Sequence, residues 1–251
     1  MISPLLDYAN RVLAHSPTGL WMLDETSGTT AADISGHSRD GTYQDGYTLG
    51  ATGPGGSVPD ATSIAGESGG LGRIEFPNSA TAPLTGDFTL GFLVKLATAS
   101  TSGWNLIALT TNDTSNNGWS QPMQLSCGGP VHDALHLRWG NGVGAETFVL
   151  EPSTSVAVAQ WQHITIIARG TTAELYLDGV SIGSATSSQT RSNSGLPMRL
   201  GRRSALSNQH GRTGEYAGLF IVSGALTEAE VQYILEPIRR PGGWSVGMIQ
   251  W

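Results

Sequence analysis

The fold is decided by Gly19-Leu20-Trp21-Met22-Leu23-Asp24-Glu25-Thr26-Ser27-Gly28, followed by Asp33-Ile34-Ser35-Gly36 and Asp40-Gly41-Thr42-Tyr43. This stretch reads as a short apolar strand, an acidic turn and two further turns punctuated by glycine. Short strands separated by tight turns are typical of an all-β architecture.

The composition of the whole chain supports the same architecture. Its 251 residues include 34 glycines, and charged residues make up only 13%, about half the usual ~25%. A size of this order fits a single β-sandwich. The net charge is −7 and Lys95 is the only lysine, which argues against nucleic acid as a partner, because binding phosphates needs clustered basic side chains.

Neither a membrane anchor nor a disulfide is expected. The chain has no run of ~18 apolar residues, and Met1–Ser16 lacks the basic and apolar regions of a secretory signal. Cys127 is the only cysteine, so no intrachain disulfide can form. We therefore expect a protein that is made in the cytoplasm and has no membrane partner.

Alternating apolar residues predict the strands. In Asp87–Leu96 every second residue is apolar, which gives a strand with one core face. Asp178-Gly179 joins two such runs and favours a type I′ hairpin turn, because both central residues need a positive φ. Further predicted strands are Leu71–Phe76, Trp104–Thr110, Met123–Ser126, Ala134–Trp139, Glu146–Leu150, Trp161–Arg169, Met198–Gly201 and Tyr216–Val222.

Short helices are predicted near both ends of the chain. Ser3 can cap the first helix, over residues 3–14, with Pro4 at its first position. Thr227 and Glu230 form a capping box for the second helix, and Pro237 is expected to end it. This divides the chain into a lead-in (residues 1–18), a β domain (residues 19–236) and a C-terminal tail (residues 237–251).

A set of downstream motifs carries a family resemblance. They are, in order, Trp161-Gln162-His163, Leu175-Tyr176-Leu177-Asp178-Gly179, Leu200-Gly201 and Ala225-Leu226-Thr227-Glu228-Ala229-Glu230. With the opening stretch, this order resembles laminin-G-like domains, which are concanavalin-A-like jelly rolls. The resemblance implies an all-β fold, a two-sheet antiparallel jelly-roll sandwich, with Trp21, Trp161 and the Phe88 strand in its core. Tyr8–Pro17 is similar to the lead-in of such domains in tailed-phage virion proteins.

Three aspartates are candidate metal ligands. Asp24, Asp33 and Asp40 lie among glycine-rich turns, and Ca²⁺ takes six to eight oxygen ligands. The alternative is that Asp33 and Asp40 cap turns through their own backbone. The strand between Tyr216 and Val222 lacks the acidic pair that many family members carry there; only Glu215 is near. A structural Ca²⁺ is therefore the one cofactor to consider.

Glycan binding needs exposed aromatic rings beside polar groups. Trp119 lies in the polar loop Asn116–Gln121 and is the first candidate, followed by Trp104 and Tyr176. The alternative is that these rings pack under loops or against a partner protein.

The sequence does not predict an enzyme. A jelly-roll glycosidase places carboxylates on alternate residues of one strand, and no such run is present; Glu174 and Asp178 flank a hairpin strand without a third acid. Gly66–Gly70 matches a nucleophile elbow, but a strand rather than a helix follows it. His132 and His136 would be ~13 Å apart on a strand, too far for one zinc ion.

The C-terminal tail is unusually apolar. Its large side chains, Trp244, Met248, Ile249 and Trp251, either close one end of the sandwich or dock on another subunit. The leading hypothesis is a non-catalytic virion structural protein, a capsid decoration or tail-associated subunit. Its partners would be other virion subunits or its own copies, and a cell-surface glycan. The alternatives are a stand-alone bacterial lectin-like module and, behind it, a glycoside hydrolase.

Overall fold

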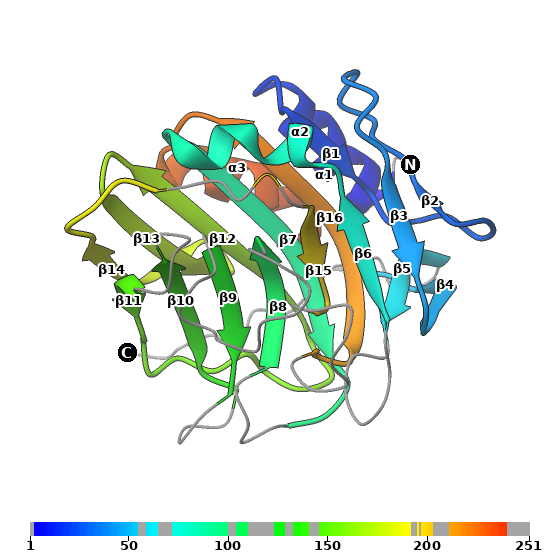
Figure 1. Cartoon of the computed structure of the whole chain (residues 1–251). Coiled ribbons are helices and arrows are strands. Elements are labelled where there is room, and N and C mark those ends of the chain that lie inside the picture. The colour runs from blue at the N-terminus through cyan, green and yellow to red at the C-terminus, as the bar shows by residue number, and fades with distance from the viewer. Residues whose placement is uncertain are drawn as a thin grey trace.

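The computed structural model describes residues 3–54, 59–64, 72–99, 104–109, 123–128, 133–140, 146–191, 195, 197–202 and 211–239. Two antiparallel eight-stranded sheets face one another, and short helices lie near both ends of the described chain (Figure 1). The predicted all-β jelly-roll sandwich is confirmed. Within the described ranges, no helix is long and apolar enough to cross a bilayer.

We call the first sheet the helix-covered sheet. Its strand order is β14-β13-β12-β7-β16-β5-β4, and β1 pairs with β16. The strands are β1 (Gly19–Trp21), β4 (Tyr47–Thr52), β5 (Pro59–Ile64), β7 (Phe88–Leu96), β12 (Trp161–Arg169), β13 (Thr172–Leu177), β14 (Val180–Thr186) and β16 (Gly214–Ser223).

We call the second sheet the polar-faced sheet. Its order is β11-β10-β9-β8-β15-β6-β3-β2. The strands are β2 (Thr30–Ala31), β3 (Gly41–Gln44), β6 (Arg73–Phe76), β8 (Trp104–Leu109), β9 (Met123–Cys127), β10 (Leu135–Gly140), β11 (Glu146–Leu150) and β15 (Met198–Leu200). The helices are α1 (Pro4–Leu13), α2 (Asn78–Thr81), the 3-10 turn η1 (Ala82–Thr85) and α3 (Glu228–Arg239).

The main core fills the space between the sheets. The alternate residues of β7 from Phe88 to Leu96 point into it, as predicted, and Trp21 is fully buried against Phe76, with ring centroids 4.5 Å apart. Trp161, expected in this core, is instead half-buried and packs against the cluster beneath the helices. It stands at the start of β12 on the opposite face, where the sandwich interior does not reach.

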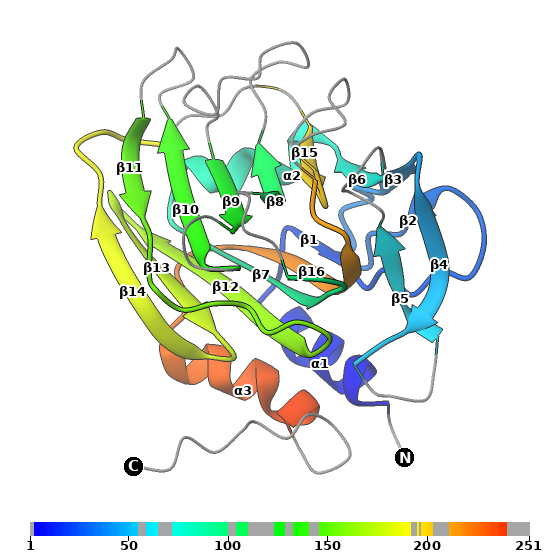
Figure 2. The same cartoon turned by 90° about the horizontal axis from the view of Figure 1, so that it is seen from below.

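Helices α1 and α3 cover the outer face of the helix-covered sheet (Figure 2). A second apolar cluster forms there, in which Leu5 and Val12 of α1 and Ile234 of α3 meet Leu93 and Phe220 of the sheet. β7, β12 and β16 are therefore buried on both faces, which explains why so many of their residues are apolar.

A buried polar network ties α1 to the sheet. The Tyr8 hydroxyl donates to the Gly218 carbonyl at 2.8 Å and lies 3.1 Å from His163 Nε2, while Thr165 Oγ1 lies 3.0 Å from His163 Nδ1. Burial, with the positive charge of Arg239 as a smaller cause, lowers the pKa of His163 to about 3. A neutral imidazole donates through Nε2 to Tyr8 and accepts at Nδ1 from Thr165, so every group in the network is satisfied.

The start of α1 departs from the prediction in one detail. Pro4 occupies the first turn and the Asp7–Arg11 pair forms at 3.4 Å, as expected, but the Ser3 side chain makes no capping bond. The Ser3 carbonyl accepts instead from the Asp7 amide at 3.0 Å. Proline has no N–H, so this helix start has one donor fewer to cap.

The predicted Asp178-Gly179 hairpin turn and the predicted capping box of α3 are both confirmed. Asp178 and Gly179 have φ of 50° and 71°, as a type I′ turn requires. At the start of α3 the Thr227 amide donates to Glu230 Oε2 at 2.7 Å, and the Glu230 amide donates to Thr227 Oγ1 at 3.3 Å. Both halves of the predicted capping box are present.

The expectation that Pro237 ends the last helix is wrong, because α3 continues to Arg239. Proline cannot donate to the carbonyl four residues earlier, that of Tyr233. Arg11 Nη1, from α1, donates to this carbonyl at 2.7 Å and also pairs with Glu236 at 2.7 Å. A neighbouring helix thus supplies the hydrogen bond that the proline removes, and residues 237–239 belong to the helix rather than to the tail.

Tyr8→Phe tests the buried network. The change removes one hydroxyl and leaves buried polar groups without their partner, so we expect the free energy of unfolding to fall by about 1–3 kcal/mol. Urea unfolding at pH 7 measures this. Tyr233→Phe, at a tyrosine on α3 that is 52% exposed, is the control and should change stability by less than about 0.5 kcal/mol. Equal effects of the two variants would contradict the role given to Tyr8.

Candidate functional site

Helices α1 and α3 cover the outer face of the helix-covered sheet. The outer face of the polar-faced sheet is therefore the first candidate for a ligand-binding surface. Inward residues of its strands, such as Leu125 and Leu137, fill the main core, and their neighbours along each strand point outward. The strand register aligns the outward positions into a row across the sheet, with Arg138 and Gln124 on one side of β8 and Arg199, Glu75 and Thr42 on the other.

The middle of the row is held by ion pairs. Glu75 Oε1 accepts from Arg73 Nε and from Arg199 Nε, both at 2.8 Å, and Arg73 also contacts Asp45 at 2.6 Å. Burial alone would lower the pKa of Arg73, but the bonds to Glu75 and Asp45 outweigh it and raise the pKa. Because Arg73 and Arg199 are less than a tenth exposed, this part of the row serves the fold.

The end of the row toward β11 is accessible. Arg138 Nη2 contacts Glu151 Oε1 at 2.5 Å, and His136 Nδ1 lies 3.1 Å from the same oxygen. His136 Nε2 lies 2.6 Å from the Gly128 carbonyl, which fixes the ring. Glu151 is 43% exposed and Arg138 30%. The bond from His136, and then Arg138, lowers the pKa of Glu151 although burial opposes this.

Two further residues complete this surface. Val149 lies opposite Arg138 in the register and is 42% exposed. Gln124 lies on the other side of Arg138 and is 8% exposed, and its Oε1 has no hydrogen-bond partner among the residues described. An unsatisfied buried amide oxygen is costly, about 1–3 kcal/mol, so Gln124 marks a strained point of this surface. We call His136, Arg138, Val149, Glu151 and Gln124 the β10–β11 site.

The aromatic candidates do not join this site within the described residues. Tyr176 is 3% exposed and belongs to the cluster beneath the helices, so its ring offers no open face to a glycan. Trp104 begins β8 opposite Cys127, but its side chain lies outside the described residues. Trp119 and the tail residues Trp244, Met248, Ile249 and Trp251 also lie outside them.

The aspartates of the opening stretch are engaged in turns. Asp33 Oδ1 accepts from the amides of Leu20 at 3.1 Å and Ser35 at 2.9 Å, and Oδ2 accepts from that of Arg39 at 2.9 Å. Burial would raise the pKa of Asp33, but these bonds outweigh it and lower the pKa.

The other two aspartates have different surroundings. Asp40 accepts from the Asp33 amide at 2.9 Å, and Asp24 is exposed. Over the described ranges, no group of three or more His, Cys, Asp or Glu residues could hold a metal ion. The turn-capping alternative therefore accounts for the bonds of Asp33 and Asp40.

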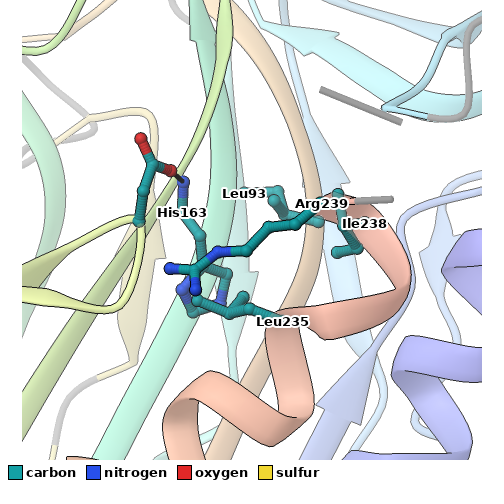
Figure 3. Close-up of a pocket in the computed structure, with 6 residues that line it drawn as sticks. Leu93, His163, Leu235, Ile238 and Arg239 are labelled. Atoms are coloured by element: carbon teal, nitrogen blue, oxygen red, sulfur yellow. Dashed lines mark hydrogen bonds between the residues drawn. The ribbon is translucent and has the colours of Figure 1, made fainter. Parts of the chain in front are cut away.

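The acids of the hairpin are similarly engaged. Glu174 accepts from Ser181 at 2.6 Å. Asp178 accepts from the His163 amide at 2.8 Å and from Gln162 at 2.9 Å. It lies beside a small cavity beneath α3, which Leu235 and Arg239 also line (Figure 3). Burial raises the pKa of Asp178. The cavity, of about 10 Å³, holds about one water at most, so it has no room for a substrate.

The remaining catalytic and zinc motifs gain no support. Gly66–Gly70 and His132 lie outside the described residues. His136, the second member of the histidine pair, is held by Glu151 and the Gly128 carbonyl. The sequence did not identify the β10–β11 site, because its residues come from β9, β10, β11 and the segment after β11. The only signal was the alternation of His136 and Arg138 with apolar residues.

Comparisons with known proteins agree on the fold. The family model of the concanavalin A-like lectin/glucanases superfamily, in its laminin-G form, matches residues 68–232, about two thirds of the chain. No match was found among curated proteins.

Solved structures with the same fold include several binding domains. The binding domain of Paraclostridial mosquitocidal protein 1 is 16% identical with a TM-score of 0.64, covering 88% of this chain and 52% of that one. A structure of botulinum neurotoxin type C, whose cell entry depends on two ganglioside molecules, is 10% identical with a TM-score of 0.65, covering 91% and 52%. The chain thus spans about half the length of these toxin structures.

A third structure is matched over almost its whole length. It is domain 4 of AbnA, a GH43 extracellular arabinanase from Geobacillus stearothermophilus, in complex with arabinotriose. It is 16% identical with a TM-score of 0.61, and the match covers 87% of this chain and 97% of that one. At these identities the likeness establishes the fold alone.

Glu151→Gln tests the electrostatics of the β10–β11 site. A lowered pKa in the folded state means that the Glu151 charge stabilises the fold above the carboxyl's ordinary pKa of 4.5. This stabilisation is lost as the pH falls through the lowered value. The difference in urea midpoint between the native protein and the variant should therefore be largest at pH 5 and shrink toward pH 3. A difference that grows on acidification would contradict the assignment.

Proposed function

This chain belongs to the concanavalin A-like lectin/glucanase superfamily, and on that premise we propose that it is a non-catalytic, glycan-binding structural subunit of a phage virion. In this proposal it is a capsid decoration or tail-associated protein. It binds neighbouring virion subunits or its own copies on one side and a cell-surface glycan on the other.

The observation that carries the glycan-binding part is the accessible β10–β11 site. Glycan hydroxyls need donors and acceptors held in fixed positions, so that little side-chain entropy is lost on binding. The ion pair between Arg138 and Glu151 and the contact of His136 with the same oxygen hold these three side chains in place. The buried amide oxygen of Gln124, which has no partner in the described chain, lies beside Arg138. Val149 adds exposed apolar surface for the C–H face of a sugar. These are the components of a polyol-binding surface.

The relatives support a binding role without specifying the ligand. The arabinanase domain was solved with arabinotriose, and the neurotoxin depends on gangliosides. Both use this fold, which hosts many unrelated functions. The glycan of this chain must therefore be found by experiment.

The state of the acids supports a non-catalytic role. A glycosidase needs a carboxylic acid whose pKa is raised so that it can donate a proton. On the polar-faced sheet, Glu151 has a lowered pKa and Glu75 is shared by two arginines. The carboxyl whose pKa is raised, Asp178, lies beneath α3 on the other sheet. No opposed pair of acids suited to glycoside cleavage is present in the described part of the polar-faced sheet.

The virion part of the proposal rests on sequence. Tyr8–Pro17 resembles the lead-in of virion domains, and residues 244–251 carry large apolar side chains, Trp244, Met248, Ile249 and Trp251, which suit contact with another subunit. A stand-alone bacterial lectin-like module is the second candidate. It is favoured by the arabinanase domain, which has the same fold outside any virion. Association with particles distinguishes the two.

A glycan array with purified full-length protein tests the binding site. We expect Arg138→Met and Glu151→Gln to weaken binding at least about tenfold, since each removes a charged hydrogen-bonding group worth about 1.5–3 kcal/mol. Glu174→Gln is the matched control, because Glu174 lies on the helix-covered sheet, and it should leave binding unchanged. Trp119→Ala tests the aromatic candidate in the same assay. Binding that survives both site variants would refute the site.

Particle proteomics and sedimentation test the assembly role. We expect the protein in purified virions, and we expect Trp244→Ser combined with Trp251→Ser to reduce its incorporation several-fold through loss of buried aromatic area. Leu6→Ser, at a leucine on α1 that is 53% exposed, is the control. A native protein that sediments as a monomer and is absent from virions would rule out the virion role and leave the lectin-like module.

A further inference from the structure

A second hollow lies on the outer face of the helix-covered sheet, which faces away from the β10–β11 site. Its lining includes Ser63 of β5, Lys95 of β7, Gly214 and Glu215 of β16, and the two alanines Ala97 and Ala159. Its volume is about 140 Å³. Pockets for drug-sized ligands are about 300–1,000 Å³, so this hollow accommodates one small ring rather than a chain of them.

The strand register places the polar groups side by side. Trp161, Lys95, Glu215, Ser63 and Thr48 are successive partners across β12, β7, β16, β5 and β4. Directly opposite residues of antiparallel strands share a face, with Cβ atoms about 4.5–5.5 Å apart. An aromatic ring, an ammonium, a carboxylate and two hydroxyls thus form one continuous row.

The centre of the row is an accessible ion pair. Lys95 Nζ and Glu215 Oε2 are 2.8 Å apart, and their side chains are 29% and 27% exposed. An ammonium has three donors and a carboxylate about four acceptor positions, so the bond between them leaves most of this capacity for other groups. Trp161, opposite Lys95, is half-buried and packs against the cluster beneath the helices.

Small residues keep the hollow open. A Cβ at Gly214 would lie 2.8 Å from the Lys95 carbonyl oxygen, so this position requires glycine. Ala159 has a φ of 58°, an uncommon conformation for alanine. The bond from its amide to the Leu96 carbonyl, at 2.9 Å, holds it there. Strained backbone of this kind costs about 1–3 kcal/mol and clusters at functional sites.

We propose that this hollow binds a single neutral sugar residue through two adjacent hydroxyl groups. One hydroxyl accepts from Lys95 while donating to Glu215, and the second bonds Ser63. The polar lining carries one positive and one negative charge. An acidic sugar that is attracted to Lys95 is repelled by Glu215 beside it, and an amino sugar that is attracted to Glu215 is repelled by Lys95, so a charged sugar gains no net attraction. Ala97 and Ala159, which are exposed and line the hollow, supply the apolar surface for the C–H face of a sugar. This site stands independently of the β10–β11 site.

Lys95 provides a specific probe, because it is the only lysine in the chain. Full-length protein labelled with lysine carrying ¹³C at Cε has one lysine signal in the NMR spectrum, without chemical modification. Titration with methyl glycosides of neutral hexoses should shift this signal saturably for at least one sugar, with a dissociation constant of about 1 mM. Methyl glucuronide is the acidic comparison and should bind at least about tenfold more weakly.

A pair of variants at one exposed position tests the hollow itself. Ala97→Leu places a large side chain in it and should abolish the saturable shift, whereas Ala97→Ser keeps it open and should preserve the shift. A thermal melt confirms that both variants fold. The assignment is overturned if no neutral sugar shifts Lys95 at up to about 50 mM, far above the ~1 mM expected. It is also overturned if the glucuronide binds best, or if the two variants behave alike.

The variants also separate this site from the proposed function. Glu151→Gln should leave the Lys95 titration unchanged, because Glu151 lies on the other sheet. Loss of array binding in Glu151→Gln with an intact Lys95 shift supports two separate sites. Loss of the Lys95 shift in Glu151→Gln would contradict a separate hollow.

Discussion

The fold depends on hiding the outer face of the helix-covered sheet. β7, β12 and β16 are apolar on both faces, so one face fills the sandwich and the other must be covered by something else. Helices α1 and α3 cover it, and the hydroxyl of Tyr8 provides the specific contact through His163 and Gly218. A buried imidazole with no partner would be costly. The network therefore positions α1 on the sheet as well as satisfying polar groups.

Covering this face also decides where ligands can bind. The helices occupy most of one sheet, which leaves the β10–β11 edge of the other sheet and the Lys95 end of β7. At both places opposite charges are paired and half-exposed, so each surface offers donors and acceptors without a strong net field. Such surfaces suit neutral, hydroxyl-rich ligands. At the β10–β11 site, His136 and then Arg138 favour the ionised form of Glu151, whereas a glycosidase acid must keep its proton.

Local signals in the sequence predicted the fold well, and contacts between distant segments account for the errors. The alternation in Asp87–Leu96, the Asp178-Gly179 turn and the Thr227–Glu230 box need only neighbouring residues, and all three are confirmed. Pro237 failed as a helix end because Arg11, 226 positions earlier in the sequence, supplies the missing donor. Tyr176 alternates with Leu175 and Leu177 and lies on the outer face of β13, but period-2 alternation does not say that a helix covers that face.

The candidate sites were harder to predict than the fold for the same reason. The β10–β11 site and the Lys95 hollow each combine one or two residues from three or more segments, and only strand register brings them together. The outer faces of two packed sheets point in opposite directions. One copy of the protein therefore cannot bring both sites into contact with the same flat glycan-bearing surface. Small, shallow sites bind weakly one at a time, but linked copies raise avidity by about 10²–10⁴. A glycan-binding role for such sites therefore favours a protein displayed in many copies, which is the arrangement a virion subunit provides.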